Sequence, residues 1–308
     1  MQARLTALSA LALVAAITAL PAHAVQRTFV ASFGNDANTA TNCGFANPCR
    51  GFTAAQTVTD SGGEIVALDA AGYGAITITK SITITANPGF YAGISASSGN
   101  AVTIATASVI VVLRGLNLNG LGASYGVNMT NGARLTIENC LISNFGTHGV
   151  NVTTQALVRM VDTTVQGNGG SGLILDGGAT ATISGSKFLD NSDRGIMALV
   201  LTTGVTAAAI SDTTVTGSFV SIQAAAQVSG ASALISVSRS TLSNNGYGPA
   251  AGANPGATAV VSISDSMVTK NGTRIYQNGA GATVESLGNN NMRQNGADSG
   301  TLTTVSPS

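Results

Sequence analysis

The sequence predicts an all-β solenoid, a coil of short parallel strands stacked turn upon turn. An apolar residue recurs eight times at intervals of 23 to 27 residues, and a period near 25 is typical of solenoids. Around these positions apolar and polar residues alternate with a period of two, as in Leu135-Thr136-Ile137, which indicates strands rather than helices. We take the recurring residues as the anchors of the turns: Leu113, Ile137, Met160, Ile183, Ile210, Val237, Ile263 and Leu287.

Residues 1–24 have the pattern of a secretory signal peptide. One positive residue, Arg4, precedes an apolar run from Leu5 to Leu20, and Ala22 and Ala24 form a small-x-small cleavage pattern. We expect cleavage after Ala24 and an exported protein located in the periplasm, on the cell surface or outside the cell. No later stretch is long and apolar enough to span a bilayer.

Residues 25–64 are expected to form a strand, a disulfide loop and a capping helix. Cys43 and Cys49 enclose a short segment with Gly44 and Pro48, which can bend the chain back, so we predict that the two cysteines are bonded in an oxidising compartment. After them the apolar residues at 52, 55 and 58 have helical spacing before a glycine pair. A short helix there would cover the open first turn, because solenoids need caps at their ends.

Residues 65–300 are expected to form the coil, and residues 301–308 a short C-terminal tail. We count about ten turns, which gives a rod about 50 Å long at the usual spacing between strands. No capping helix is visible at the C-terminal end, so that end is expected to leave an open strand edge.

An Asn recurs eight residues after several anchors and predicts a ladder of amide hydrogen bonds between turns. Asn also tolerates the left-handed backbone of a tight turn, and the Gly that follows it is expected to have positive φ. Phe145 and Ser218 take this place in two turns. The Asn residues of the ladder are Asn168, Asn191, Asn245, Asn271 and Asn295. Cys140 lies three residues after its anchor, where other turns have small residues, so we interpret it as core and not as a reactive thiol.

The repeats and the N-terminal segment together resemble the right-handed parallel β-helix superfamily typified by pectate and pectin lyases. In the N-terminal segment the resemblance is carried by a strand RTFVAS, the loop Gly34-Asn35-Asp36, Pro48 before a short helix, the pair Gly62-Gly63 and a strand EIVAL. It covers nearly all of the chain after residue 24. The resemblance implies a right-handed coil and a polysaccharide partner; the lyases among these proteins remove a proton next to a uronate carboxylate. Because one fold serves many functions, it does not select a reaction.

The best polar cluster of the sequence lies eleven residues after three successive anchors. His148, Ser171 and Arg194 share this position, so they should face the same side of the coil. In a lyase or related enzyme, Arg194 would hold a sugar carboxylate, His148 would act as base or hydrogen-bond donor, and Asp193 would orient Arg194. Ser171, Lys187 and Asp190 are candidate ligand-binding residues nearby. The alternative is a solvated loop ion pair beside a turn histidine, since exposed pairs of this kind are common.

A second stacked position, two residues after the anchors, is rich in Asp and Asn. These residue types favour tight turns, and we interpret the position as a turn and not as a catalytic carboxylate pair. Gly185 interrupts the acidic run, so the column does not support a Ca²⁺ site, and we expect neither a metal nor another cofactor. The residues at this position are Asn139, Asp162, Gly185, Asp212, Arg239, Asp265 and Asn289.

Composition excludes several functions. Without residues 1–24 the chain keeps 12 basic against 13 acidic groups and no clustered cations, which argues against nucleic acid as a partner. His148 is then the sole histidine, which excludes a two-histidine metal site. The five tyrosines are scattered and Trp is absent, so no extended aromatic sugar groove is visible. A polysaccharide-interacting protein and a non-catalytic envelope or surface scaffold therefore remain open, as do catalysis itself and the oligomeric state.

Overall fold

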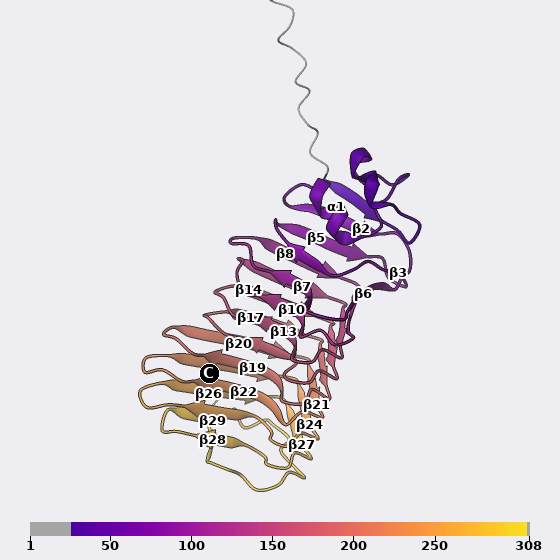
Figure 1. The fold of residues 1–308 in the computed structure, drawn as a ribbon. Coiled ribbons are helices and arrows are strands. Elements are labelled where there is room, and N and C mark those ends of the chain that lie inside the picture. Colours follow the sequence, from indigo (N-terminus) through magenta and orange to yellow (C-terminus); the bar gives the residue numbers. More distant parts are fainter. Residues whose placement is uncertain (1–25, 307–308) are drawn as a thin grey trace, which may run out of the picture.

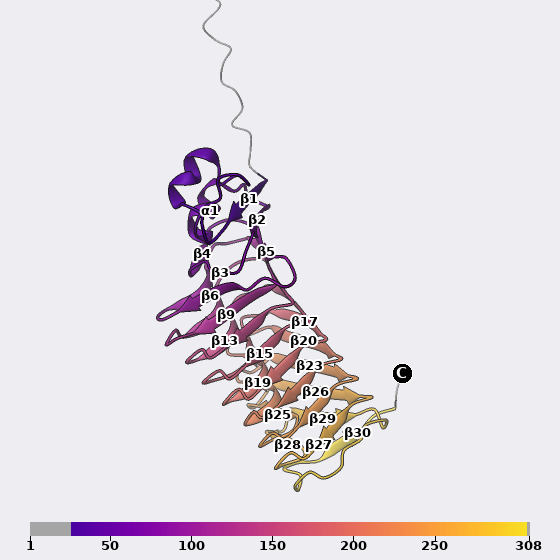
Figure 2. The same ribbon diagram turned by 90° about the vertical axis from the view of Figure 1, so that its right-hand side faces the viewer.

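The computed structural model describes residues 26–306, which wind into a parallel β-helix of nine complete turns. Each complete turn gives one strand to each of three sheets, which we call A, B and C in the order in which a turn visits them. Figures 1 and 2 show the elongated coil with the N-terminal elements at one end and the last strands at the other. The predicted fold class is therefore confirmed.

Sheet A has 12 strands, and sheets B and C have nine each. Sheet A consists of β1 (Arg27–Val30), β2 (Gly63–Ala67), β5 (Ile82–Ala86), β8 (Ile110–Arg114), β11 (Arg134–Glu138), β14 (Leu157–Val161), β17 (Thr180–Ser184), β20 (Val205–Ser211), β23 (Ser232–Ser238), β26 (Thr258–Ser264), β29 (Ala282–Ser286) and β30 (Leu302–Thr304). Sheet B consists of β3 (Ala71–Gly72), β6 (Ala92–Ala96), β9 (Leu116–Gly120), β12 (Leu141–Ser143), β15 (Thr164–Gln166), β18 (Lys187–Leu189), β21 (Thr214–Thr216), β24 (Thr241–Ser243) and β27 (Met267–Thr269). Sheet C consists of β4 (Ile76–Ile78), β7 (Asn100–Ile104), β10 (Tyr125–Met129), β13 (His148–Val152), β16 (Leu173–Leu175), β19 (Arg194–Val200), β22 (Val220–Ala226), β25 (Ala250–Ala253) and β28 (Tyr276–Asn278).

The apolar anchors stack in register and fill the interior. Ile137 pairs with Leu113 on one side and Met160 on the other, and all three side chains are fully buried. The eighth anchor was placed one residue too late, because Ser286 and not Leu287 pairs with Ile263. Strand β29 ends at Ser286, so the Leu287 side chain follows the end of the strand and lies on the outer face of sheet A.

The N-terminal elements cap the coil. As predicted, Cys43 and Cys49 form a disulfide, and the loop that they close bonds to β1 on its open side, with the N–H of Phe29 donating to the carbonyl of Cys43. A 3-10 helix spans Asp36–Thr41 and α1 spans Phe52–Val58. Gln56 of α1 bonds to Thr77 O and to Thr79 N at 2.9 and 3.2 Å, so its amide covers the edge of β4 as a further strand would.

Two turn columns clarify the roles of Asn and Gly. The second stacked position forms tight turns as predicted, with positive φ from Asn139 through Asp265, but in the last turn the positive φ is at Gly288 and not at Asn289. In the amide ladder the prediction for glycine was wrong, because φ is positive at the residue before each Asn and not at the Gly after it. Those glycines are required by close packing instead; a Cβ at Gly169 would lie 2.4 Å from Gly146 O.

Three further predictions concern single segments. Cys140 is buried, in keeping with a core residue. Residues 302–304 of the expected tail form β30, which extends sheet A beside β29. Among residues 26–306 no helix is long and apolar enough to cross a membrane, and the expected signal peptide and its cleavage after Ala24 lie outside the described residues.

Candidate functional site

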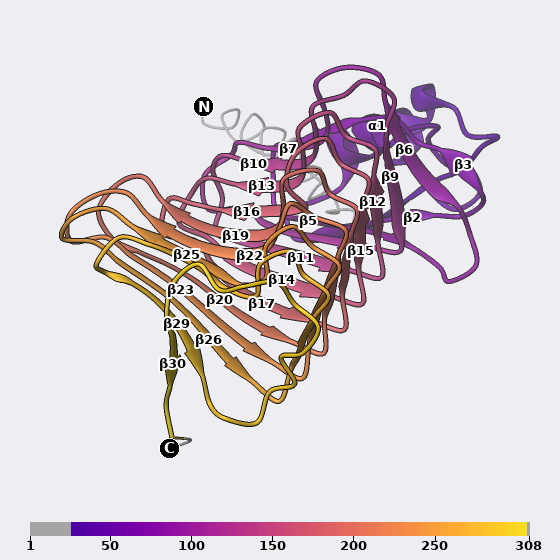
Figure 3. The same ribbon diagram turned by 90° about the horizontal axis from the view of Figure 1, so that it is seen from below.

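Four of the predicted site residues meet at sheet C. His148, Asp193 and Arg194 are partly exposed on its outer face, whereas Ser171, a predicted ligand-binding residue, is fully buried. His148 begins β13 and Arg194 begins β19, and Ser171 lies on the turn of the coil between them. The parallel register brings these residues together although 46 positions separate His148 from Arg194 in the sequence. Figure 3 shows the strands of sheet C in a row along the coil.

A chain of hydrogen bonds connects the four residues. The backbone N–H of Ser171 donates to Nδ1 of His148 at 2.9 Å, and Ser171 Oγ donates to Oδ2 of Asp193 at 3.4 Å. The Asp193 carboxylate in turn accepts from a terminal guanidinium nitrogen of Arg194. Both charged side chains are about one-third exposed, at 28% for Arg194 and 37% for Asp193. The pair is therefore reachable by a ligand in solution.

A further residue, Gln223 on β22, fixes Arg194 from the other side. Nε of Arg194 donates to Oε1 of Gln223, so the guanidinium is held between the carboxylate of its own turn and an amide of the next turn. Two of its five N–H groups are used in this way, which leaves three donors for a ligand. A fixed guanidinium with free donors suits bidentate binding of a carboxylate. Sequence reasoning missed Gln223, because a single glutamine carries no motif.

The environment of His148 makes it a hydrogen-bond donor. Burial lowers the pKa of His148 below its ordinary value; the charge of Asp193 acts in the opposite sense, and that of Arg194 lowers the pKa again. The neutral ring accepts the Ser171 N–H at Nδ1, so its proton resides on Nε2. The ring also packs against Tyr125 of the preceding turn, with centroids 5.7 Å apart.

The two remaining candidates lie on another sheet. Lys187 begins β18 of sheet B and is exposed, and Asp190 follows β18 in a turn with φ of 52°. Asp190 thus serves the same left-handed turn position as Asn144 and Asn244 in other turns. The structure does not bring Lys187 and Asp190 to the cluster on sheet C.

A hollow of about 270 Å³ adjoins Arg194 on the C-terminal side. Ala250 and Gly252 line it together with Arg194, Tyr247 and Tyr276. The two tyrosine rings contact each other edge to face at 5.4 Å, and Phe219 contacts Tyr247 at 5.2 Å. The expectation that the tyrosines are scattered is therefore wrong for Tyr247 and Tyr276, which neighbouring turns bring together.

A change in turn length explains why the hollow opens beside Arg194. Four residues, 190–193, connect β18 to β19, but only three, 217–219, connect β21 to β22. At the same turns the strands of sheets A and C lengthen from five or fewer to seven residues. In the sequence only the increase of the repeat from 23 to 27 residues is visible at these turns, which is an indirect signal of the two opposing changes.

The acidic turn column offers no comparable site. The carboxylate of Asp212 accepts two hydrogen bonds from Arg239 on the next turn, at 2.9 and 3.0 Å. Among the described residues no three His, Cys, Asp or Glu side chains are grouped as metal ligands would be. Asp212 and its neighbours act as turn residues.

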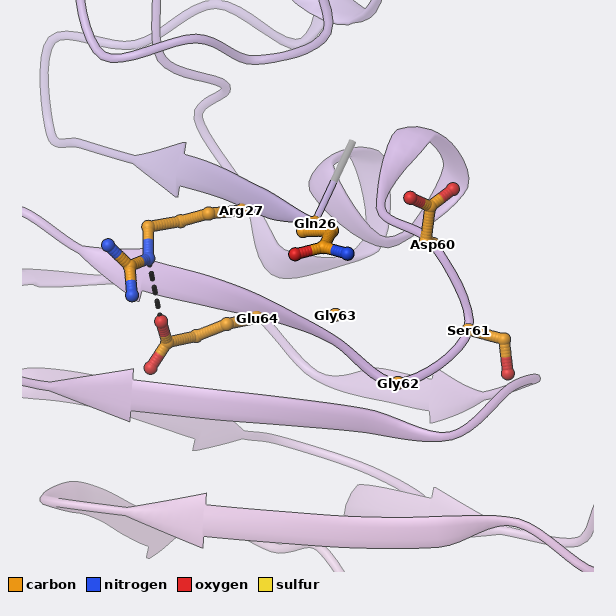
Figure 4. A pocket seen from close by; sticks show the side chains of 7 residues that line it. All are labelled: Gln26, Arg27, Asp60, Ser61, Gly62, Gly63 and Glu64. Atoms are coloured by element: carbon orange, nitrogen blue, oxygen red, sulfur yellow. Dashed lines mark hydrogen bonds and ion pairs between the residues drawn. The ribbon is translucent and has the colours of Figure 1, made fainter. Parts of the chain in front are cut away.

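A hollow of about 720 Å³ lies at the N-terminal end of the described chain (Figure 4). Arg27 and Glu64 line it and neutralise each other through a hydrogen bond of 2.8 Å. It adjoins Gln26, where the described residues begin, and belongs to the first turn of the coil. The predicted site residues instead occupy the fourth to sixth turns.

Comparisons with known proteins agree with the architecture. The family model described as the right handed beta helix region matches residues 23–208 and 92–300. Among solved structures, the pectate lyase Pel9A superposes with a TM-score of 0.64 at 15% identity, over 85% of this chain and 75% of that one. The A-module of the Azotobacter vinelandii mannuronan C-5 epimerase AlgE4 gives a TM-score of 0.45 at 12% identity, over 79% of this chain and 88% of that one. No curated protein sequence gives a significant match. The chain belongs to the right-handed β-helix family.

Proposed function

We propose that this protein is exported and binds an acidic polysaccharide on the outer face of sheet C, with Arg194 as the residue that holds a sugar carboxylate. The observation that carries the proposal is the fixed guanidinium beside a ring-sized hollow edged by Tyr247 and Tyr276. Aromatic rings provide apolar faces for sugar rings, and a guanidinium provides paired donors for a carboxylate. The shared fold with a pectate lyase adds support from a protein named for an acidic polysaccharide.

In this proposal the site binds its ligand without cleaving it. A lyase needs a base at the proton next to the carboxylate, and His148 uses its free ring nitrogen to accept from Ser171. Its Nε2–H is then suited to donate to a sugar hydroxyl or carboxylate. Asp193 is likewise occupied by Arg194, which it positions. The proposal requires no cofactor.

Export rests on the sequence pattern of residues 1–24 and on the disulfide between Cys43 and Cys49. Disulfides persist in oxidising compartments outside the cytoplasm, where polysaccharides of the cell envelope and surroundings are also found.

Isothermal titration calorimetry of the purified protein with polygalacturonate and with alginate tests the proposal, with neutral dextran for comparison. We expect binding to one acidic polymer that weakens with added salt, and a loss of affinity of about tenfold or more in Arg194→Ala. Arg239→Ala is the matched control, because Arg239 also pairs with an Asp but lies in the turn column between sheets A and B. Equal binding by wild type and Arg194→Ala, or no binding to either acidic polymer, would contradict the proposal and favour a scaffold.

The same preparations separate binding from catalysis. Unsaturated sugar ends absorb in the ultraviolet, and we expect no increase in absorbance during incubation with either acidic polymer. An increase that disappears in His148→Ala would show that the site is a lyase and that His148 is not only a donor.

A further inference from the structure

The outer face of sheet A is uncharged over four successive strands. The outward residues of β17, β20, β23 and β26 are Thr, Ser, Ala, Val or Leu, and none of them is charged. We call this surface the sheet A plateau. Val205 and Leu234 are 50% and 37% exposed on it, and exposed patches with aliphatic side chains are typical of interaction sites. Figure 3 shows strands of sheet A on one side of the coil and those of sheet C on another.

The plateau is shaped to pack against a second sheet. Thr182, Ala209, Ser236 and Ser262 follow one another across it in a single column, because each pairs with the next by strand register. These small side chains line a shallow hollow of about 260 Å³. Sheets that pack face to face insert side chains from each inner face into such spaces on the other.

Opposite charges lie at the two ends of this column. The register continues it to Arg159 of β14 on one side and to Glu285 of β29 on the other. Arg159 is 53% exposed and shares the single carboxylate of Glu138 with Arg114, which leaves one positive charge unbalanced there. Glu285 accepts from the hydroxyl of Ser262 at 2.7 Å, and among residues 26–306 no cation pairs with it. The column is therefore positive at one end and negative at the other.

We infer that the sheet A plateau is the interface of a symmetric dimer, in which two copies of this chain pack face to face about a two-fold axis parallel to the strands. The axis passes between β20 and β23, so each column faces the same column of the second copy in reverse order. Arg159 then faces Glu285 of the second copy at both ends, and Ala209 faces Ser236 in the middle. A two-fold axis along the column would instead set Arg159 against Arg159 and Glu285 against Glu285, which like-charge repulsion disfavours.

The columns on either side are complementary in the same arrangement. In one of them the exposed Leu234 faces the small Ala207 of the second copy, because these two residues are register partners on β23 and β20. The other column runs from Val161 on β14 to Leu287, which follows β29 on the outer face of sheet A. Leu287 then faces Val161 of the second copy, so an apolar contact lies beside each ion pair.

The area of the plateau is that of a weak dimer. From β14 to β29 there are five steps between strands, which cover about 24 Å, and the strands of seven residues are about 23 Å long. Two such faces bury roughly 1,000 Å² together, near the lower limit for a specific interface, so we expect a dissociation constant in the micromolar range. The Arg194 cluster on sheet C stays uncovered, and the dimer does not depend on the proposed polysaccharide binding.

Sedimentation equilibrium of the purified protein, at concentrations from well below to well above the micromolar range, provides the test. We expect wild type to pass from monomer to dimer. Ser236→Arg places a charge at the centre of the plateau and should raise the dissociation constant about tenfold or more. Thr214→Arg is the matched control, because it adds the same charge at an outward position of sheet B and should dimerise as wild type does. Circular dichroism and thermal unfolding confirm that each variant is folded.

Charge reversal tests the orientation of the two copies. Arg159→Glu and Glu285→Arg each set like charges against one another and should each weaken the dimer about tenfold. Both changes in one chain restore opposite charges across the interface, so the dissociation constant should return toward that of wild type. Within one copy the two positions are on the order of 24 Å apart, so this rescue cannot arise inside a single chain.

A protein that stays monomeric at every concentration would overturn the inference, as would a dimer that folded Ser236→Arg leaves unchanged. A double variant that dimerises no more tightly than Arg159→Glu or Glu285→Arg alone would also overturn it, because independent structural effects add and do not cancel.

Discussion

His148 and Ser171 are joined across one turn of the coil, with the Ser171 N–H donating to Nδ1 of His148 at 2.9 Å. This bond exists only while Nδ1 is unprotonated. Because the bond and burial both favour the neutral ring, His148 should titrate below its ordinary value of about 6.5.

The first prediction concerns this titration. In NMR spectra of the ring nitrogens, His148 should show the Nε2–H form at pH 7 and a pKa below 6.5. The unfolded chain takes up this proton at a higher pH than the folded chain does. Lowering the pH through 6.5 should therefore reduce the free energy of unfolding, and His148→Gln should lessen that dependence. A pKa of His148 at or above 6.5 would contradict a ring that is kept neutral by burial and by the hydrogen bond from Ser171.

The second prediction concerns Glu138, which binds Arg114 of the preceding turn and Arg159 of the next. The hydrogen bond from Arg114 is the main cause that holds the pKa of Glu138 below its usual range; burial opposes it, and Arg159 adds to it. The stabilisation is present above the pKa of an unfolded glutamate, about 4.3, and is lost as the pH falls below it.

Glu138→Gln should therefore lower stability by about 0.5–1 kcal/mol at pH 7 and have little effect near pH 3, as measured by urea unfolding. Glu64→Gln is the control, because Glu64 has a single partner, Arg27, with a side chain that is 63% exposed. An equal or greater loss of stability in the Glu64 variant would mean that the second arginine partner of Glu138 contributes no additional stability.

Much of this architecture could be read from the sequence, because the interior repeats. Ile137, Met160 and Ile183 lie paired in the interior, as the anchor pattern predicts. The pattern determines the register because a shift by one residue would turn each apolar side chain to the surface. The same columns correctly joined His148 to Arg194. The surroundings of Arg194 were harder to predict, because outward-facing residues such as Gln223 and Tyr276 follow no period and their positions depend on where turns shorten and strands lengthen.

The third prediction concerns Cys140, the free cysteine of the described chain. Burial raises its pKa to about 11, and its Sγ donates to the carbonyl of Glu138 at 3.3 Å. The folded protein should therefore not react with a disulfide reagent at pH 8 and should react once upon unfolding. Cys140→Ser should change stability by less than about 1 kcal/mol, because Ser186 makes the equivalent bond to Ser184 O in its own turn. Rapid labelling of the native protein would contradict the buried position.

The last prediction concerns the break in the amide ladder between Asn191 and Ser218. In the other steps of the ladder from Phe145 to Asn295, a backbone N–H donates to the Asn Oδ1 of the next turn, as from Asn168 to Asn191 and from Ser218 to Asn245. Ser218 is too short to offer this acceptor to Asn191, and its own buried hydroxyl has no partner. Gly195 lies in the same turn as Asn191 and has no side chain, so it leaves space beside Ser218. Gly172 leaves space beside Asn191 in the same way.

Ser218→Asn should therefore complete the ladder and raise the free energy of unfolding by about 1 kcal/mol. Ser221→Ala is the matched control, because it removes the neighbouring unpartnered buried hydroxyl without adding an acceptor for Asn191. Hydrogen exchange of the Asn191 amide distinguishes the two variants, since it should slow in Ser218→Asn alone. A stabilised Ser218→Asn variant whose Asn191 amide exchanges as fast as in wild type would mean that the gain comes from filling space and not from the ladder.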